Sequence, residues 1–179
     1  ELVKQCVLWN RHYHEIFYKK YSQKMYTLCL AYSSSDDDAK DVMQDGFVKV
    51  FTSLKQYSGT GSLEGLVRKI IVNTAIDFYR KKRKEIRNIN IDDVHDLAYD
   101  ESVLNALNAK HLIDLIRKLP EGANLIFNLY VIEGYNHEEI AKKLDISIGT
   151  SKSQLSRAKS LLKEYIENFS LVKMATEKT

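Results

Sequence analysis

Residues 136–165 read NHEEIAKKLDISIGTSKSQLSRAKSLLKEY, in which a tight polar turn separates two short helical patterns. Asn136 can cap the first helix, and Glu139 stands three residues later, as a capping box requires. Asp145 falls at the turn. Many motifs of this kind have Gly there, because the chain must enter the left-handed region, which Asp tolerates better than most residues. Ser147 can cap the second helix, so the stretch predicts a helix-turn-helix.

Each of the two predicted helices has an apolar side. These sides consist of Ile140, Ala141 and Leu144 in the first helix, and of Leu155, Ala158, Leu162 and Tyr165 in the second. The other side of the second helix carries short donors and cations, which reach phosphates and base edges when a helix lies in the major groove. A solvated surface explains that side alone equally well, but the two-helix pattern favours DNA binding. The candidate DNA-contacting residues are Thr150, Lys152, Ser153, Ser156, Arg157 and Lys159.

The overlapping stretch EGYNHEEIAKKLDISIGTSKSQLSRAKSLL, residues 133–162, resembles region four of the sigma factors, specifically the short two-domain extracytoplasmic-function (ECF) group. One residue departs from that family's pattern, because Ser151 stands where the family usually has an apolar residue. A hydroxyl facing the core weakens the packing of the recognition helix unless it bonds to a backbone carbonyl. The resemblance implies that the six candidate residues contact the minus-thirty-five promoter element.

The composition of the whole chain favours an all-helical protein of two small domains, since its 179 residues include one Pro and seven Gly. A net charge of +3 does not by itself indicate nucleic-acid binding, because the distribution of charge creates a binding surface. Cys6 and Cys29 are far apart, so neither a disulfide framework nor a structural zinc site is expected. No apolar run approaches the roughly 20 residues of a membrane span, and the first residues lack a signal-peptide pattern. We therefore expect a cytoplasmic location.

Apolar residues from about Val7 to Tyr32 recur at near-helical spacing and predict one long amphipathic helix. Three serines then break the pattern, and three aspartates open a second predicted helix over residues 36–54. This second helix has an apolar stripe of Ala39, Val42, Met43, Phe47, Val50, Phe51 and Leu54. Its opposite side carries an acidic patch of Asp38, Asp41, Gln44 and Asp45.

An acidic patch repels DNA phosphates and suits a basic protein partner, although a solvated acidic face is common on helices. The segment DAKDVMQDGFVKVFTSLKQY, residues 38–57, resembles sigma region two, in which the equivalent helix binds the clamp of core RNA polymerase. The resemblance implies that Asp38, Asp41, Gln44 and Asp45 bind the polymerase.

The Gly-rich stretch 56–62 (QYSGTGS) is predicted to be a connector, since it lacks the Lys and helix start of a phosphate-binding loop. A helical face then runs from Leu63 to Tyr79, and Asn73 and Thr74 predict a break or short loop within it. Cations beside aromatic side chains are typical of surfaces that bind single-stranded or melted DNA, although a basic run alone is often only solvated. This cationic block consists of Arg80, Lys81, Lys82, Arg83, Lys84 and Arg87, next to Phe78 and Tyr79.

The segment SLEGLVRKIIVNTAIDFYRKKRK, residues 62–84, resembles the part of ECF region two that melts and reads the minus-ten element. The match implies that Asn73 borders a pocket for a base flipped from the non-template strand. Leu63 and Leu66 stand where the family commonly has an aromatic followed three residues later by Trp, so weaker stacking is expected there. The implied minus-ten residues are Asn73, Thr74, Asp77, Tyr79, Arg80, Lys81, Lys82 and Arg83.

Residues 86–102 lack lasting periodicity and are rich in Asp, as an acidic linker is. Apolar residues from Leu104 to Leu119 predict another helix, Pro120 can occupy the first turn of the next, and Gly134 can end that one. The segment KLPEGANLIFNLYVIEG, residues 118–134, again resembles the family. The predicted domains are residues 1–85, for polymerase and minus-ten binding, and residues 103–170, for minus-thirty-five binding.

Taken together, the chain is identified as a member of the ECF sigma factors, which implies that it binds promoter DNA and the clamp and flap regions of core RNA polymerase. An anti-sigma factor is a further candidate partner, and we expect no catalytic residue, metal, cofactor or small-molecule substrate. One alternative is a helix-turn-helix repressor whose first domain senses a ligand or dimerises, which leaves the acidic patch and VNTAIDFYRKKRK unexplained. Another is a metal-dependent phosphohydrolase using Asp36, Asp37, Asp38 and His12, for which the sequence offers no second ligand cluster.

Overall fold

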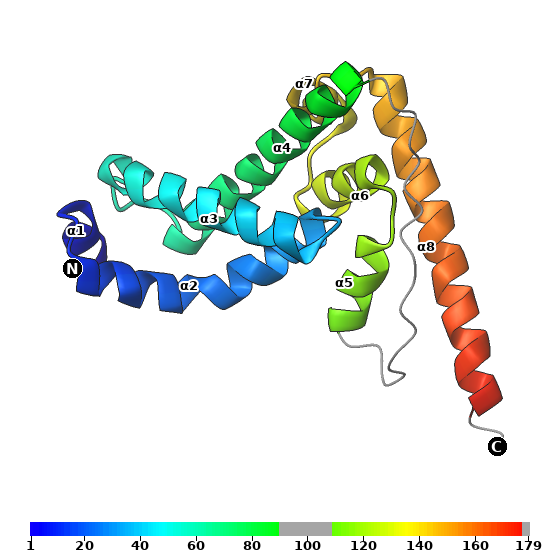
Figure 1. The fold of residues 1–179 in the computed structure, drawn as a ribbon, viewed down its shortest axis with the longest axis horizontal. Coiled ribbons are helices and arrows are strands. Elements are labelled where there is room, and N and C mark those ends of the chain that lie inside the picture. The colour runs from blue at the N-terminus through cyan, green and yellow to red at the C-terminus, as the bar shows by residue number, and fades with distance from the viewer. Residues whose placement is uncertain (90–108, 177–179) are drawn as a thin grey trace. The chain divides into compact units, whose positions relative to one another are not determined.

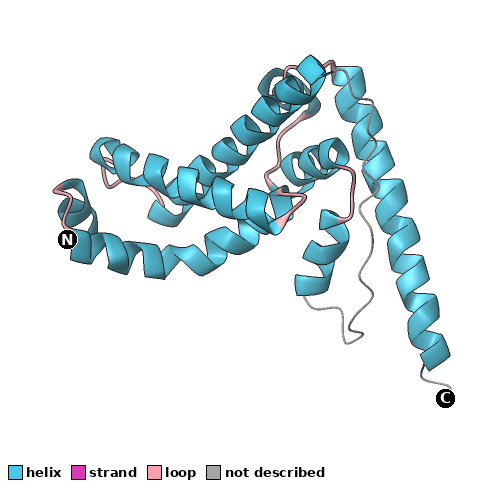
Figure 2. Ribbon diagram, viewed as in Figure 1, coloured by secondary structure: helices cyan, strands magenta, loops and turns pink. Residues whose placement is uncertain are grey.

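The computed structural model describes residues 1–89 and 109–176 (Figure 1). All regular secondary structure in these residues is helical, which confirms the all-α prediction (Figure 2). The chain divides into two compact units, Glu1–Phe78 and Tyr79–Thr179. The division falls inside the long helix α4 (Leu63–Ile89). The proposed functional domains, 1–85 and 103–170, remain a prediction.

Unit 1 begins with two helices, α1 (Leu2–Val7) and α2 (Arg11–Tyr32). The long helix predicted from about Val7 to Tyr32 is present as α2, but it begins at Arg11, and a separate short helix precedes it. The chain turns between them because Trp9 adopts a left-handed backbone conformation with φ of 58°. Asn10 then starts α2, and its Oδ1 accepts a hydrogen bond from the backbone N–H of His12 at 3.2 Å. The capped start at Asn10 thus places the beginning of the long helix later than predicted.

Helix α3 (Asp36–Ser53) follows the predicted break at the three serines, and a short 3₁₀ turn, η1 (Leu54–Gln56), continues it. The Ser35 Oγ accepts from the Asp38 N–H at 3.1 Å, and three aspartates lie in the first turn, at the positive end of the helix dipole. Most of the predicted apolar stripe is buried and packs against α2. The buried core of α2 and α3 comprises Phe17, Tyr21, Met25, Leu28, Cys29, Tyr32, Ala39, Val42, Met43, Phe47 and Val50.

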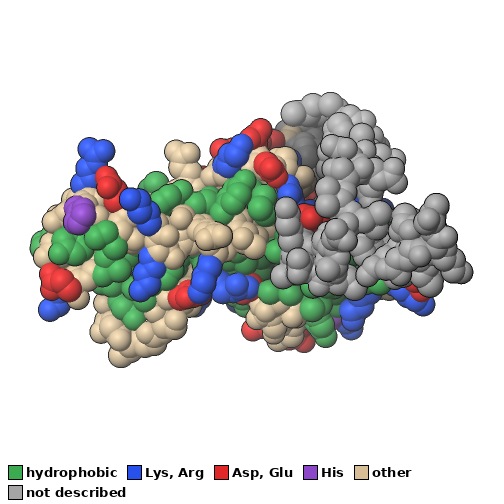
Figure 3. All heavy atoms as spheres, turned by 90° about the horizontal axis from the view of Figure 1, so that it is seen from below, with side chains coloured by type: hydrophobic (Ala, Val, Ile, Leu, Met, Phe, Trp, Pro, Cys, Tyr) green, Lys and Arg blue, Asp and Glu red, His purple; other side chains and the backbone are tan. Residues whose placement is uncertain are grey.

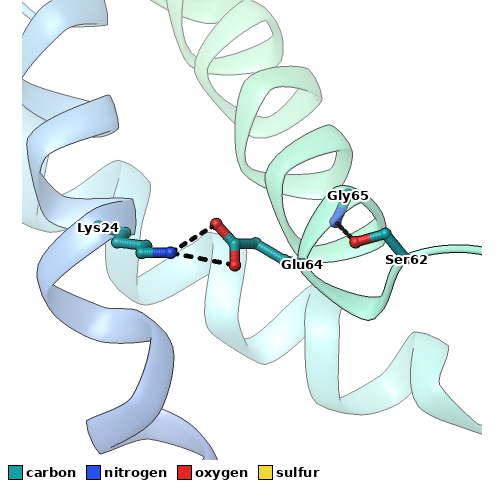
Figure 4. Close-up of polar contacts among 4 residues, drawn as sticks. All are labelled: Lys24, Ser62, Glu64 and Gly65. Atoms are coloured by element: carbon teal, nitrogen blue, oxygen red, sulfur yellow. Dashed lines mark hydrogen bonds and ion pairs between the residues drawn. The ribbon is translucent and has the colours of Figure 1, made fainter.

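Helix α4 starts after the predicted connector, where Ser62 Oγ accepts from the Gly65 N–H at 3.1 Å (Figure 4). Close by, Lys24 of α2 pairs with Glu64, with Nζ 3.0 Å from Oε1 and 3.2 Å from Oε2. The predicted break at Asn73 and Thr74 is wrong, because α4 continues through both. The Thr74 hydroxyl donates to the Ile70 carbonyl at 2.9 Å, so it bonds within the helix without ending it.

The predicted linker begins at residue 86, but residues 86–89 still belong to α4. The rest of that linker, residues 90–102, and the predicted helix start at Leu104 lie outside the described residues. Unit 2 resumes with α5 (Ala109–Arg117), which contains the predicted apolar residues Leu112, Leu115 and Ile116.

The remaining elements of unit 2 are α6 (Glu121–Phe127), the π-helix η2 (Asn128–Ile132), α7 (His137–Leu144) and α8 (Ile148–Thr176). Pro120 is the N-cap residue of α6, directly before the first turn in which it was predicted, and it makes no side-chain cap bond. Gly134, with φ of 77°, follows the π-helix. A core of Leu115, Ile116, Leu119, Ala123, Ala158 and Leu162 joins α5, α6 and α8.

Two buried asparagines bind the backbone in this core. Asn124 Nδ2 donates to the Ile116 carbonyl at 2.7 Å, and Asn128 Nδ2 donates to the Asn124 carbonyl at 3.1 Å. These bonds satisfy buried polar groups where α6 passes into the π-helix.

Side chains of both charges are interspersed with apolar ones on the visible face of the N-terminal helices (Figure 3). Among the described residues, no helix is both long enough and apolar enough to cross a membrane. Because this face shows no large area of a single charge, a surface that binds a partner has to be identified from individual side chains and their neighbours.

Candidate functional site

The outer side of α3 carries the predicted acidic patch. Asp41, Gln44 and Asp45 are exposed, whereas Asp38 is half-buried and its Oδ2 accepts from the Ser34 hydroxyl at 3.1 Å. Val48, four residues after Gln44 and three after Asp45, is 60 % exposed on the same side. The sequence interpretation did not include Val48, although this helical spacing was the available signal. We call Asp38, Asp41, Gln44, Asp45 and Val48 the acidic α3 surface.

Two aspartates of this surface are available to a partner. Asp41 and Asp45 are exposed and have no ion-pair partner within residues 1–89 and 109–176. Asp37, by contrast, lies 2.9 Å from Lys40 Nζ, and this hydrogen bond raises the pKa of Lys40. The acidic α3 surface therefore presents two carboxylates that a basic partner can bind.

The predicted minus-ten residues lie along α4. Asn73, Asp77, Arg80 and Lys81 follow one another at spacings of four, three and one residues, so they share one side of the helix. Asp77 Oδ2 lies 3.2 Å from Lys49 Nζ of α3, and its side chain is 59 % exposed.

Thr74 borders that side, three residues before Asp77 and seven before Lys81, but its side chain is turned to the interior. It is 3 % exposed, and its hydroxyl is bonded to the Ile70 carbonyl, so its place in α4 does not support the predicted contact with DNA.

Tyr79, Lys82 and Arg83 form a second side of α4, because they follow one another at spacings of three and one. Within unit 2, Lys82 Nζ lies 3.3 Å from Glu121 Oε1. Arg80 and Lys81 are exposed, whereas Tyr79, Lys82 and Arg83 are half-buried. The cationic block thus divides between two sides of one helix.

The helix-turn-helix has the predicted local geometry. Asn136 Oδ1 accepts from the Glu139 N–H at 2.9 Å, and Glu139 Oε2 accepts from the Asn136 N–H at 2.8 Å, which completes the capping box. Asp145 adopts the left-handed conformation with φ of 53° and ψ of 53°. Ser147 Oγ accepts from the Thr150 N–H at 2.9 Å and so starts α8.

Helix α8 separates its predicted DNA-contacting side from its core side. Lys152, Ser153, Ser156, Arg157 and Lys159 are exposed, and Thr150 is half-buried. The buried side consists of Ser151, Leu155, Ala158 and Leu162. The Thr150 hydroxyl bonds to Ser147 at 2.9 Å, and the Ser153 hydroxyl donates to the Thr150 carbonyl at 3.0 Å.

Ser151 is fully buried, and its Oγ lies 2.9 Å from Nδ1 of His137. The sequence interpretation required a backbone carbonyl as partner, but the structure provides an imidazole. The His137 ring also stacks on Tyr130, with centroids 4.7 Å apart. Nothing in the sequence indicates this contact, since Ser151 and His137 are separated by 14 positions and a turn.

The residues that the phosphohydrolase alternative requires, Asp36, Asp37, Asp38 and His12, do not form a metal site. Among the described residues, no group of three or more His, Cys, Asp or Glu side chains is arranged to hold a metal ion. His12 lies in the first turn of α2, and the aspartates lie in the first turn of α3.

Two family models match the chain. The model for sigma-70 region 2 matches residues 17–85, and the model for sigma-70 region 4 matches residues 110–162. The chain belongs to the sigma-70 family. The first match contains the acidic α3 surface and the cationic block as far as Lys84. The second contains residues 136–162 of the helix-turn-helix stretch.

Similar proteins place this sigma factor in the ECF group. It is 28 % identical over 162 residues to the ECF RNA polymerase sigma factor SigE of Mycolicibacterium smegmatis, a match that spans 85 % of this chain and 61 % of SigE. It is 25 % identical to the ECF RNA polymerase sigma-E factor of Haemophilus influenzae, over 83 % of this chain and 84 % of that one. With SigV of Bacillus subtilis it shares 29 % identity, over 80 % of this chain and 84 % of SigV.

A solved structure has a similar fold. The sigma factor RpoE of Bartonella quintana, solved in complex with the anti-sigma factor NepR, superposes with a TM-score of 0.51 at 21 % sequence identity. The superposition covers 86 % of this chain and 98 % of that one. At this identity the likeness concerns the fold alone.

Proposed function

We propose that this sigma factor binds core RNA polymerase through the acidic α3 surface and gives the enzyme promoter specificity through α4 and α8. The observation that carries the proposal is the separation of charge along the chain. Exposed carboxylates without an ion-pair partner among the described residues lie on α3, and exposed cations lie on α4 and α8. Carboxylates favour a basic protein partner, and cations favour DNA.

On α4, Asn73 is proposed to read one base of the minus-ten element. Its amide both donates and accepts hydrogen bonds, and it shares a side of the helix with Arg80 and Lys81, which can hold the backbone beside that base. Unstacking a base costs a few kcal/mol, which binding of the extruded base offsets. Promoter opening by this route requires no covalent step.

On α8, the exposed side is proposed to enter the major groove of the minus-thirty-five element. Lys152 and Lys159 supply cations for phosphates, and Arg157 supplies the planar fork that binds the edge of guanine. Ser153 and Ser156 supply short hydroxyl donors between these cations.

The same proposal covers partners and location. It makes the protein a regulator of transcription and not an enzyme, working in the cytoplasm with the polymerase clamp and flap. An anti-sigma factor, such as the one bound to the Bartonella quintana sigma factor, is a candidate for a further partner.

The test is reconstitution of the full chain with bacterial core RNA polymerase. We expect the chain to be retained by core polymerase in a pull-down and the complex to give discrete run-off transcripts from genomic fragments. Asp41→Lys and Asp45→Lys should weaken retention, because they place cations against a basic partner. Glu15→Lys is the matched control, since Glu15 is an exposed carboxylate on α2 of the same unit.

A repressor would behave differently in the same assay. It would bind DNA without the polymerase, and adding it to core enzyme would produce no promoter-specific transcript. That result, with the wild-type chain folded, would refute the proposed function.

A further inference from the structure

Two residues of α8, Ser151 and Lys159, contact a pair of stacked rings, His137 and Tyr130, that belong to other elements of unit 2. Ser151 Oγ lies 2.9 Å from His137 Nδ1. Lys159 Nζ lies 5.9 Å from the centroid of the Tyr130 ring. The rings of His137 and Tyr130 stack with centroids 4.7 Å apart and an interplanar angle of 29°. The contacts therefore run from Ser151 through two rings and back to Lys159.

The bond to Ser151 restrains α8 in a way that its apolar neighbours do not. Leu155, Ala158 and Leu162 are buried on the same side of α8. Burial of these side chains fixes which side of α8 faces the core, but it opposes small rotations only weakly, because apolar burial is non-directional. A hydrogen bond weakens steeply as its geometry departs from alignment, so the Ser151–His137 bond favours one rotation of α8.

The position of the Ser151–His137 bond affects the direction of the exposed side chains of α8. Ser151 lies in the first turn of α8, directly before Lys152 and Ser153. A small rotation at this turn would redirect both side chains, as well as Arg157 farther along the same helix. Lys159 is restrained separately, because its ammonium lies over the face of Tyr130.

We propose that His137 and Tyr130 are positioning residues that set how α8 presents its exposed side to the minus-thirty-five element. The inference rests on the proposed function of α8. His137 acts through Ser151 and controls base preference, and Tyr130 acts through Lys159 and controls a phosphate contact.

The test of His137 separates positioning from stability. His137→Phe keeps a ring that can stack on Tyr130, but it leaves the buried Ser151 hydroxyl without its imidazole partner. Adding Ser151→Ala removes that hydroxyl, so the double variant should recover the stability that the single variant loses. His137→Asn is the conservative variant, because its side-chain amide can lie near the place of Nδ1.

Holoenzyme containing each full-length variant is assayed on promoters that carry every single substitution in the minus-thirty-five element. We expect the stable double variant to lose about tenfold in discrimination at one or more positions, and His137→Asn to restore it. An unchanged preference profile in the double variant, or a loss that His137→Asn does not restore, would overturn the role of His137. If the wild-type holoenzyme itself shows no preference, the proposed function fails instead.

Tyr130 is tested by Tyr130→Leu in the same holoenzyme. Releasing Lys159 should weaken binding to all minus-thirty-five sequences alike, by about twofold to fivefold. Tyr135→Leu is the matched control, because Lys143 lies 4.8 Å from the centroid of Tyr135 but belongs to α7. Equal affinities for the two variants would overturn the role of Tyr130.

Discussion

Gly46 of α3 lies against Ile71 of α4 so closely that a Cβ atom at position 46 would collide with the Ile71 side chain. Both residues are buried. The missing side chain thus allows the helix that carries the acidic α3 surface to approach the helix that carries Asn73.

Replacing Gly46 by Ala should therefore lower the free energy of unfolding. Overpacking costs about 1–3 kcal/mol, and only about 1 kcal/mol returns through the better helix propensity of Ala. Urea denaturation of the full chain measures the net loss. Gly65→Ala is the matched control in α4, since a Cβ there would meet Ser62 at an ordinary 3.5 Å. Equal stability of the two variants would contradict a tight contact at Gly46.

Val48 is expected to be an apolar anchor within the acidic α3 surface. It is 60 % exposed, so Val48→Ala should leave stability nearly unchanged while weakening core polymerase binding by about 1 kcal/mol or more. A binding titration with core enzyme provides the measurement. Ile16→Ala on α2, where Ile16 is 42 % exposed, is the control, and an equal effect of both variants would argue against an anchor.

Arg157 is expected to read a base. Arg157→Ala should cost about 1–3 kcal/mol at one minus-thirty-five position, whereas loss of a phosphate contact would weaken all sequences equally. Transcription from a set of substituted promoters distinguishes these results. Lys152→Ala serves as the comparison, and a wild-type order of preference in Arg157→Ala would show that Arg157 reads no base.

Asn73 is expected to determine preference at one minus-ten base. Asn73 does not cap a helix, because it lies inside α4 (Leu63–Ile89). Asn73→Asp removes the amide donor and adds a negative charge near DNA, so it should alter that one preference while the protein still folds. An unshifted profile across all minus-ten positions would leave Asn73 with no part in recognition.

Cys29 is expected to reduce stability in alkaline solution. Burial raises the pKa of its thiol from 9.0 to about 12. Between these values the folded chain keeps a proton that the unfolded chain releases, so stability is complete below pH 9 and falls as the pH rises, by about 1.4 kcal/mol per pH unit. Denaturation at pH 8, 9 and 10 should show a shallower loss in Cys29→Ala, and parallel losses would contradict this origin.

The sequence predicts local structure well where a side chain bonds to nearby backbone. Asn136 with Glu139, Asp145 and Ser147 all act within a few positions, so their residue types are sufficient to indicate caps and a turn. Apolar periodicity does not locate the start of α2, because the single left-handed residue Trp9 separates α1 from α2 without disturbing the spacing of the apolar residues around it.

The break predicted within α4 was wrong, because polar residues in an apolar pattern do not necessarily end a helix. Thr74 suggested a break, but its hydroxyl bonds to the Ile70 carbonyl and the helix continues. The His137–Ser151 contact was not predictable, since it depends on how two helices pack across a turn.

The π-helix Asn128–Ile132 has a consequence for insertions and deletions. Its wider turn closes with the Glu133 N–H on the Asn128 carbonyl at 3.0 Å, one residue more than an α-helical turn contains. Because each residue turns a helix by about 100°, deleting one position here would rotate Tyr130 away from His137 by roughly a quarter turn. The number of residues between α6 and the capping box thus sets the orientation of Tyr130 relative to His137. Insertion or deletion of a single residue in this segment should therefore be tolerated far less than substitution.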